Sequence, residues 1–292
     1  MSFTQPSFEP VRFGILGAAN IAREFMAGVQ HSPLVIVRAV ASRDENKARD
    51  FAKTYHIDHY HASYEAMLAD PEIEAVYIPL PNDLHAHWAI KAVEAGKHVL
   101  CEKPMTVTVE EAEEIAAITK RTNGICAVNY GYSGYPLVRE MRAMVKRGDL
   151  GRIRLIRTEF AHGFHADAAD ADNPRVRWRY DPAQAGLSSQ FADCGIHALH
   201  LASFVSGQDA QDLSASFASL LPGRVLEDDA WVSIRMDGGA LVRLWTSSVA
   251  IGRMHGFRAT HHAVARIGYC RIWIGLSSTQ EFDDGRCADL SL

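Results

Sequence analysis

The sequence lacks the features that would assign it to several common protein classes. It has no uninterrupted apolar stretch of about 18 residues, and its N-terminus has no charged segment followed by an apolar one, so neither a membrane span nor a secretory leader is expected. The formal net charge is −5 and there is no long basic run, which argues against a nucleic-acid or anionic-membrane partner. We therefore expect a cytoplasmic protein that acts on a small molecule.

Paired cysteines and metal-ligand clusters are also scarce. The five cysteines form no Cys-x-x-Cys pair, and Cys101 and Cys126 lie in apolar runs, where thiols usually pack as small hydrophobic groups. Two His-x-His pairs occur, but no third and fourth ligand joins them at a spacing typical of zinc sites. We expect neither a disulfide framework nor a bound metal.

What the sequence does contain, up to about residue 128, is a regular alternation of apolar runs and segments with helical periodicity. Such alternation is typical of right-handed β-α-β crossovers and of a parallel, doubly wound sheet. The predicted strands are residues 11–16, 34–41, 75–79, 98–101 and 125–128, and the predicted helices are residues 20–30, 44–55, 84–95 and 108–122.

Signals for helix ends support these boundaries. Asp44 and Thr108 precede helical runs as N-caps, and Glu111 follows Thr108 at the spacing of a capping box. Gly96 follows the helix predicted at 84–95, as a C-cap residue does.

After Gly124 the pattern changes. A predicted helix at 136–147 is followed by evenly spaced strand-like runs, and Gly238-Gly239 is expected to form a hairpin turn between the last two. We therefore predict an α/β domain over residues 1–128 and a substrate and oligomerisation domain of α+β class, with a mainly antiparallel sheet, over residues 129–292. The strands predicted in the second domain are residues 153–161, 213–220, 229–236 and 240–248.

The turn after the first strand has the spacing of a nucleotide-binding loop. Gly17 supplies the tight turn, and Ala19 and Ala22 occupy the later two positions of a Gly-x-Gly-x-x-Gly/Ala fingerprint. Asn20 and Ile21 begin the helix, whose free N–H groups and dipole favour a pyrophosphate. The alternative is an ordinary strand-turn-helix unit in which the small residues serve packing.

The end of the second strand indicates which nucleotide is bound. An acidic residue there accepts the ribose hydroxyls of NAD, but this sequence has Ser42 and Arg43, with Lys47 one helical turn on. These residue types bind phosphate, so we expect NADP as the preferred cofactor and NAD as the alternative. The alternative is that Arg43 and Lys47 form a solvated face at the start of a helix, where Asp44 would partly neutralise them.

The stretch from His98 to Pro104 leads from an apolar strand into Glu102 and Lys103. A lysine at the carboxyl end of a parallel strand faces the crevice where such sheets bind ligands. Lys103 is expected to stabilise a developing alkoxide, or to act as the base if burial lowers its pKa.

A second candidate segment contains Asp-x-Gly-x-His. If it is helical, Asp193, His197 and His200 share one face, and an imidazole that titrates near neutrality can take the hydroxyl proton of an alcohol while hydride leaves the same carbon. Gly195 costs about 1 kcal/mol relative to alanine inside a helix, which suggests that a flat group, such as a nicotinamide ring, approaches the backbone there. The alternative is that His197 only packs in the core and that Lys103 is an ordinary surface charge.

Two further groups are candidates for binding. Pro81, Asn82 and His85 follow the strand predicted at 75–79 and so are expected at the cofactor crevice. Trp178 and Arg179 are expected to line a sugar pocket by stacking and hydroxyl recognition, or else to form a packing cluster.

Together these motifs resemble the Gfo/Idh/MocA family of oxidoreductases, typified by glucose–fructose oxidoreductase and inositol dehydrogenase. The resemblance covers about residues 11–258, and its matching stretches are residues 14–22, 81–85, 96–104 and 193–197. It implies an N-terminal Rossmann domain, a C-terminal domain with an open, mainly antiparallel sheet, a tightly held nicotinamide cofactor, hydroxyl-rich substrates and a homo-oligomer.

The resemblance also implies roles for single residues. Lys103 and His197 look like the catalytic pair, Asp193 looks like a partner of the substrate or of the histidine, and Glu102 and Pro104 look like residues that position Lys103. The predicted cofactor contacts are Gly17, Ala19, Asn20, Ile21, Ser42, Arg43, Lys47, Pro81, Asn82, His85, Glu102 and Lys103, and the predicted substrate contacts are Lys103, Trp178, Arg179, Asp193 and His197.

The predicted function is therefore hydride transfer between NADP or NAD and a secondary alcohol or ketone of a sugar, polyol or related cyclic alcohol. Two alternatives stay open. One is a redox-neutral reaction of the kind that NAD-dependent glycosidases of this resemblance carry out. The other is a non-catalytic nucleotide-binding sensor or corepressor.

The end of the chain departs from the family pattern. Family chains usually run some tens of residues longer and complete the second sheet, whereas from about Ala259 this sequence follows neither a strand nor a helix period, and residues 283–288 resemble coil. We hypothesise an altered tail, of the kind a shifted reading frame gives. Such a tail would leave the sheet without edge strands and would put the homo-oligomer in doubt.

Overall fold

The computed structural model of the protein describes residues 9–167, 173, 176–253, 256–263 and 269–274. The chain divides into two compact units, Met1–Asn129 and Tyr130–Leu292.

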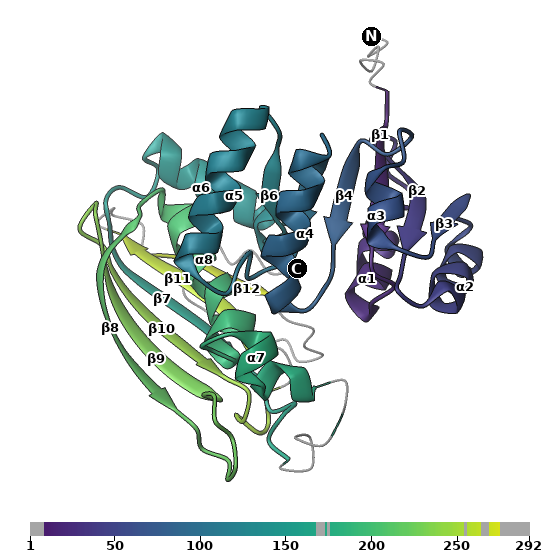
Figure 1. The fold of residues 1–292 in the computed structure, drawn as a ribbon. Helices are drawn as coiled ribbons and strands as arrows, with labels where there is room; N and C mark the ends of the chain where they lie inside the picture. Colours follow the sequence, from purple (N-terminus) through teal and green to yellow (C-terminus); the bar gives the residue numbers. More distant parts are fainter. Residues whose placement is uncertain (1–8, 168–172, 174–175, 254–255, 264–268, 275–292) are drawn as a thin grey trace. The chain divides into compact units, whose positions relative to one another are not determined.

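The first unit is built on a six-stranded parallel sheet with strand order β3-β2-β1-β4-β5-β6 (Figure 1). The strand order reverses between β1 and β4, and ligands of open α/β sheets bind at such a point. The parallel α/β class predicted from the sequence is confirmed. The elements are β1 (Val11–Leu16), α1 (Asn20–Val29), β2 (Val35–Ala41), α2 (Glu45–Tyr55), β3 (His59–His61), α3 (Tyr64–Leu68), β4 (Ala75–Ile78), α4 (Asn82–Glu94), β5 (His98–Cys101), α5 (Val109–Thr122) and β6 (Cys126–Val128).

The short elements β3 and α3 were not predicted, because three and five residues are too few to show a period. Contacts with distant parts of the chain stabilise these two elements instead. β3 pairs with β2 at the edge of the sheet, and Met67 on α3 is fully buried in the core of this unit.

Helix ends in this unit follow the predicted capping signals. The hydroxyl of Thr108 accepts a hydrogen bond from Glu111 N (3.2 Å), and the Glu111 carboxylate accepts one from Thr108 N (3.3 Å), which completes a capping box on α5. Asp44 Oδ1 accepts a hydrogen bond from Lys47 N (3.2 Å) and caps α2.

No helix in the part of the chain that the structure describes is both long and apolar enough to cross a membrane.

The second unit is built on a six-stranded sheet with strand order β12-β11-β7-β10-β9-β8. Its strands pair antiparallel except for β7 with β10, which confirms the mainly antiparallel sheet predicted for this half. The elements are α6 (Pro136–Arg147), β7 (Ile153–Ala161), α7 (Pro182–Ala185), α8 (Ile196–Ser206), β8 (Ala210–Ala218), β9 (Asp229–Met236), β10 (Leu241–Ser247), β11 (Gly256–Ala263) and β12 (Tyr269–Ile274).

Strict alternation on β9 shows how this sheet is covered on one face. Val232, Ile234 and Met236 are buried, whereas Trp231 and Arg235 are exposed. A turn at Gly238-Gly239 joins β9 to β10, as predicted, and Gly239 adopts a φ of +85° that disfavours other residues.

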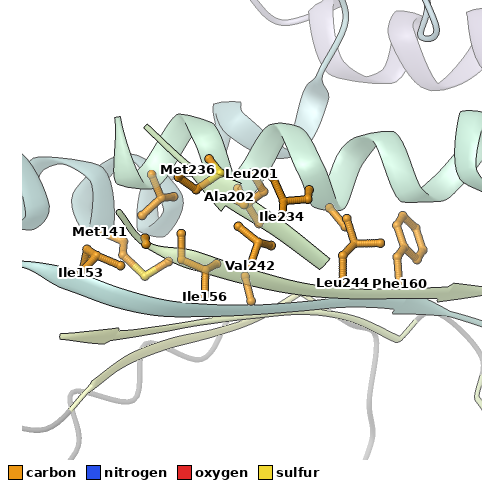
Figure 2. Packing of buried hydrophobic residues seen from close by; sticks show 14 of the residues in the cluster. Met141, Ile153, Ile156, Phe160, Leu201, Ala202, Ile234, Met236, Val242 and Leu244 are labelled. Atoms are coloured by element: carbon orange, nitrogen blue, oxygen red, sulfur yellow. The ribbon is translucent and has the colours of Figure 1, made fainter. Parts of the chain in front are cut away.

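α6 and α8 cover the buried face of this sheet (Figure 1). Leu201 and Ala202 of α8 lie over the side chains of Ile156, Val242 and Leu244, and all five are at most 1% exposed (Figure 2). This packed layer fixes the position of α8 on the sheet.

The tail of the chain departs from its prediction. The altered tail was expected to leave the sheet without further edge strands, but β11 continues to Ala263 along β7, and β12 then pairs with β11. The hypothesis that the tail is altered stays a hypothesis. Phe257 and Ala259 face the core. The segment has no clear strand pattern in its sequence, but its backbone forms hydrogen bonds with β7, which lies about 100 residues earlier in the chain, and this pairing makes it a strand. Residues 283–288, predicted as coil, lie outside the described part.

Candidate functional site

The carboxyl ends of the parallel strands bring most of the predicted cofactor residues together. In a parallel sheet these ends lie along one edge, where ligands bind. The residues that directly follow β1, β2, β4, β5 and β6 are Gly17, Ser42, Pro79, Glu102 and Asn129.

The β1–α1 turn has the shape that an approaching phosphate needs. Gly17 has a φ of +126°, and a Cβ built there would lie 3.0 Å from Leu80 Cδ2, so the position is closed to larger residues. α1 begins at Asn20, and Ala19 before it provides no side-chain cap. The N-terminal N–H groups and the positive end of the helix dipole therefore suit an anion such as a pyrophosphate.

The end of β2 presents cations to solvent. Arg43 and Lys47 are exposed. Burial raises the pKa of Tyr64, and the positive charge of Arg43 opposes this shift. Asp44 caps α2 with one carboxylate oxygen, and its other oxygen lies 3.8 Å from Lys47 Nζ. Ser42 is buried, and its hydroxyl oxygen accepts a hydrogen bond from Asp44 N (3.2 Å). One carboxylate oxygen of Asp44 is thus already used as the cap of α2.

Glu102 is the centre of a buried hydrogen-bond network at the ends of β4, β5 and β6. Tyr77 Oη donates to Glu102 Oε1 (2.5 Å), and Asn129 Nδ2 donates to the same oxygen (2.7 Å). Lys103 N donates to the other oxygen (3.3 Å). Burial, together with the nearby carboxylate, raises the pKa of Tyr77, so its hydroxyl keeps its proton. Sequence reasoning missed Tyr77 and Asn129, because their partner is more than 20 residues away in the chain.

His85 lies on α4, and both of its ring nitrogens contact backbone carbonyl oxygens. Nδ1 lies 2.7 Å from Pro104 O, and Nε2 lies 2.7 Å from Leu80 O. The ring is 1% exposed, and this burial lowers the pKa of His85, while the two carbonyls and the Glu102 carboxylate oppose the shift. Both ring nitrogens of His85, which was predicted as a cofactor contact, therefore lie against the protein's own backbone. Pro81 and the buried Asn82 stand at the start of the same helix.

In the second unit, His197 is buried at the start of α8 among aromatic rings. Its ring meets Tyr132 edge-on at 4.8 Å and Tyr130 edge-on at 5.9 Å, measured between ring centroids. His200 stacks on the other face of this group, with its ring 3.9 Å from that of Tyr130. Burial lowers the pKa of His200, and Arg142 adds to the shift.

Three of the predicted substrate residues lie together beside this helix. Arg179 Nε lies 3.1 Å from Asp193 Oδ2, and both side chains remain about 30% exposed, at 30% and 28%. The guanidinium of Arg179 also lies 4.6 Å from the centroid of the Trp178 ring. The cluster combines a carboxylate, a guanidinium and an aromatic face, which are the groups that bind hydroxyl-rich molecules.

The Asp-x-Gly-x-His segment is not a regular α-helix. Phe191–Gly195 forms a π-helical turn before α8, a distortion that recurs at functional sites. A Cβ at Gly195 would lie 2.5 Å from Phe191 Cδ2. The Phe191 ring therefore lies against Gly195 and gives a packing reason for the glycine, while the approach of a nicotinamide ring at this point stays a prediction.

A residue that the sequence did not reveal fixes this turn. The buried carboxylate of Glu227 accepts hydrogen bonds from Ser188 Oγ (2.7 Å), Ser189 N (3.1 Å) and Phe191 N (2.9 Å). It thus caps the turn that carries Asp193 from a position 36 residues further along the chain.

Among the residues that the structure describes, no group of three or more His, Cys, Asp or Glu side chains is arranged to hold a metal ion. Cys101, Cys126 and Cys194, among the described residues, are not joined in disulfides. Burial raises the pKa of Cys126 to about 11 and that of Cys101 well above its usual value, which disfavours their thiolate forms.

Comparison with known families agrees with both halves of the fold. Residues 11–130 match the oxidoreductase family with an NAD-binding Rossmann fold, and residues 138–264 match the GFO/IDH/MocA C-terminal domain.

Three individual proteins show the extent of the similarity. The uncharacterized oxidoreductase YfiI of Bacillus subtilis (strain 168) is 30% identical, over 86% of this chain and 67% of its own length. The D-xylose 1-dehydrogenase (NADP(+)) 2 of Haloferax volcanii is 34% identical, over 67% of this chain and 57% of its own length. The crystal structure of an inositol dehydrogenase homolog from Azotobacter vinelandii, complexed with NAD+, has a TM-score of 0.82 at 31% identity and covers 91% of this chain and 71% of that one.

Proposed function

Because the chain belongs to the Gfo/Idh/MocA family of NAD-binding oxidoreductases, we propose that it transfers hydride between a nicotinamide dinucleotide and a secondary alcohol or ketone of a sugar, polyol or related cyclic alcohol. One observation carries this proposal. The uncapped start of α1 and Lys103 both lie at the carboxyl edge of one parallel sheet, where a dinucleotide binds.

The residues at this edge fit such a cofactor. Gly17, Ala19, Asn20 and Ile21 would hold the pyrophosphate on the N-terminus of α1. Among candidate cofactors, NADP is favoured, because the exposed Arg43 at the end of β2 suits a 2′-phosphate.

Ser42 and Lys47 would support Arg43 in that role. The Ser42 hydroxyl accepts a hydrogen bond from Asp44 N and keeps its own proton to donate. Lys47 adds a second positive charge on the first turn of α2.

The proton chemistry is assigned to Lys103 and His197. Oxidation of a secondary alcohol removes a hydride from carbon and a proton from the hydroxyl, and a nicotinamide held at this edge would supply the hydride acceptor. Lys103 Nζ stabilises the developing alkoxide, and Lys103 or the His197 imidazole takes the proton. Asp193, paired with Arg179, orients the substrate or the histidine.

The substrate class rests on the cluster of Trp178, Arg179 and Asp193. An aromatic face beside a carboxylate and a guanidinium binds the alternating apolar and hydroxyl surfaces of a sugar or polyol. The similarity to a D-xylose dehydrogenase and to an inositol dehydrogenase homolog supports the same class.

The first experiment titrates the purified chain with NADPH and NADH, followed by a screen of sugars and polyols for cofactor reduction or oxidation. Lys103→Met is expected to lower kcat by about 10²- to 10⁴-fold, while binding of NADPH is kept. Lys120→Met, which removes an exposed lysine of α5 far along the helix from its start, is the matched control.

Two outcomes would contradict the proposal. A Lys103→Met variant that keeps full hydride transfer would remove Lys103 from the chemistry. Tight cofactor binding with no net oxidation or reduction of any sugar or polyol would favour the redox-neutral reaction or the sensor.

We also propose that the protein forms a homo-oligomer through the outer face of the second sheet. This face exposes Trp231 (56%) and Leu241 (40%), and the rings of Trp231 and Trp245 stack at 5.3 Å. Exposed aromatic and aliphatic groups on one sheet face are typical of an interface. A solution mass equal to that of one chain would contradict this assignment.

A further inference from the structure

Lys103 stands between two neighbours in the chain that are both anchored by hydrogen bonds. Glu102 before it is buried, and the carbonyl oxygen of Pro104 after it contacts His85. Long-range partners thus hold the backbone on each side of the lysine.

The first anchor joins three strands. Tyr77 comes from β4 and Asn129 from the residue after β6, and both donate to Glu102 Oε1 at the end of β5. The Tyr77 ring is itself fixed, because it stacks on Phe25 of α1 with ring centroids 4.3 Å apart and an interplanar angle of 18°. The Tyr77 side chain is also fully buried, so packing as well as the hydrogen bond holds its hydroxyl against Glu102.

The second anchor joins the lysine loop to α4. The His85 ring is buried between Leu80 O, in the turn after β4, and Pro104 O, with both nitrogen to oxygen distances at 2.7 Å. A carbonyl oxygen only accepts, so each hydrogen bond requires an N–H of the ring, and the neutral imidazole that burial favours has one. The buried ring therefore donates to one of the two carbonyls and packs against the other, and in this way it lies between the residue after Lys103 and the neighbouring turn of the sheet edge.

We propose that Tyr77, Asn129 and His85 are positioning residues, which fix the place and the protonation behaviour of the Lys103 amine through Glu102 and Pro104. The inference rests on the proposed function of Lys103. A lysine side chain has four rotatable bonds, so its amine is held in place only if the backbone that carries it is held. A displacement of about 1 Å at a reacting group costs about 10²-fold in rate.

The same anchors fix the carboxyl group beside the lysine. Glu102 accepts hydrogen bonds from Tyr77, Asn129 and Lys103 N, so three donors hold its two oxygens in place. Loss of a donor would move this group relative to the amine and so change the pKa of the amine.

Four variants test the proposal. Tyr77→Phe removes one hydroxyl and keeps the stacked ring, His85→Asn keeps a donor for one carbonyl, and His85→Leu keeps none. The fourth, Asn129→Leu, removes the amide donor to Glu102.

Two matched controls remove the same groups elsewhere in the unit. Tyr55→Phe deletes a hydroxyl at the end of α2, and His87→Asn replaces an exposed histidine two residues from His85 on α4.

The main readout needs neither substrate nor cofactor. Lysine amines are labelled by reductive ¹³C-methylation, the signal of Lys103 is assigned with Lys103→Arg, and its pKa is measured by NMR titration. Steady-state kcat, KM and the pH profile of kcat are then measured with NADPH or NADH and a sugar found in the screen, together with thermal unfolding.

If the proposal is right, Tyr77→Phe and His85→Leu shift the pKa of the Lys103 amine and lower kcat by about 10- to 100-fold, with the pH profile displaced in the same direction. KM for the cofactor changes much less. His85→Asn recovers part of the loss relative to His85→Leu, and both controls behave as the unaltered protein.

The proposal is overturned if the variants lower the unfolding temperature but leave the amine pKa and the pH profile unchanged, since that pattern is a purely structural role. If His85→Leu does not fold, Tyr77→Phe decides the question, because it deletes a single oxygen. A failure of the proposed function is separate: it shows as full activity in Lys103→Met, whereas the inference fails when that variant is inactive and Tyr77→Phe matches Tyr55→Phe.

Discussion

At the scale of single residues, the side chains of the first unit differ in what holds them. Glu102 is buried and accepts hydrogen bonds from other elements, and His85 is buried against two backbone carbonyls, whereas Arg43 and Lys47 stand exposed on a helix start. The positions of Glu102 and His85 depend on the whole fold, whereas the contribution of Arg43 and Lys47 depends mainly on the charge of the side chain. A single substitution at Arg43 or Lys47 should therefore change cofactor specificity without damage to the fold.

Arg43→Asp is expected to shift the preference from NADPH toward NADH. It removes a guanidinium that suits a 2′-phosphate, and it adds a carboxylate that accepts ribose hydroxyls. A hydrogen bond to a charged group contributes about 1.5–3 kcal/mol, so the ratio of the two dissociation constants should change by about 10- to 100-fold. Fluorescence titration with both cofactors measures this ratio.

Lys53→Asp provides the control for this substitution, because it makes the same charge change in the last turn of α2. An unchanged cofactor ratio in Arg43→Asp, or an equal change in Lys53→Asp, would reject the 2′-phosphate assignment.

At the scale of elements, the start of each functional helix is stabilised in a different way. α5 has a capping box within its own sequence, the π-helical turn before α8 is capped by the distant Glu227, and α1 follows an alanine that provides no side-chain cap. The start without a side-chain cap is the one proposed to bind a phosphate, which would satisfy N–H groups that the side chains leave open.

Thr108→Ala is expected to lower the free energy of unfolding by about 1 kcal/mol, because it removes the side-chain acceptor of the α5 capping box. Urea denaturation should show a lower midpoint with an unchanged slope. Thr108→Ser keeps the hydroxyl and should retain most of the stability. Equal loss in both variants would show that the methyl group, and not the hydrogen bond, is responsible.

At the scale of the whole molecule, the core of the second unit contains an ionisable side chain. His261 on β11 is fully buried on the inner face of the sheet, and this burial lowers its pKa to about 4. An unfolded chain binds a proton at a histidine near pH 6.5, so protonation favours the unfolded state at lower pH.

Stability should therefore fall with pH in a defined window. Since the folded pKa lies below the unfolded one, the contribution of His261 is constant above about pH 6.5, decreases as the pH falls to about 4, and is constant again below that value, a loss of about 3 kcal/mol. Denaturant unfolding at a series of pH values measures this loss. Other groups titrate in the same window, so the test is the difference between the protein and His261→Leu, which should lose this part of the pH dependence. Parallel curves for the two proteins would contradict the assignment.

Much of the first unit could be predicted from the sequence, because its signals are local. The alternation of strands and helices, the turn at Gly17 and the caps at Asp44 and Thr108 depend on residues a few positions apart, and the structure contains them near the predicted boundaries. The second unit was predicted less completely. Its π-helical turn and the strand at Gly256–Ala263 have no clear period in the sequence.

Local signals in the sequence are enough for the long elements of the first unit, the fold class and the residues that follow the predicted strands, since periodicity and turn chemistry act over short distances. The meeting of Tyr77 and Asn129 at Glu102, the contact of His85 with Pro104 O and the addition of β11 to β7 became known only from the folded chain. These contacts join segments from about 20 to 100 residues apart, and no local pattern encodes which segments the packed core brings together.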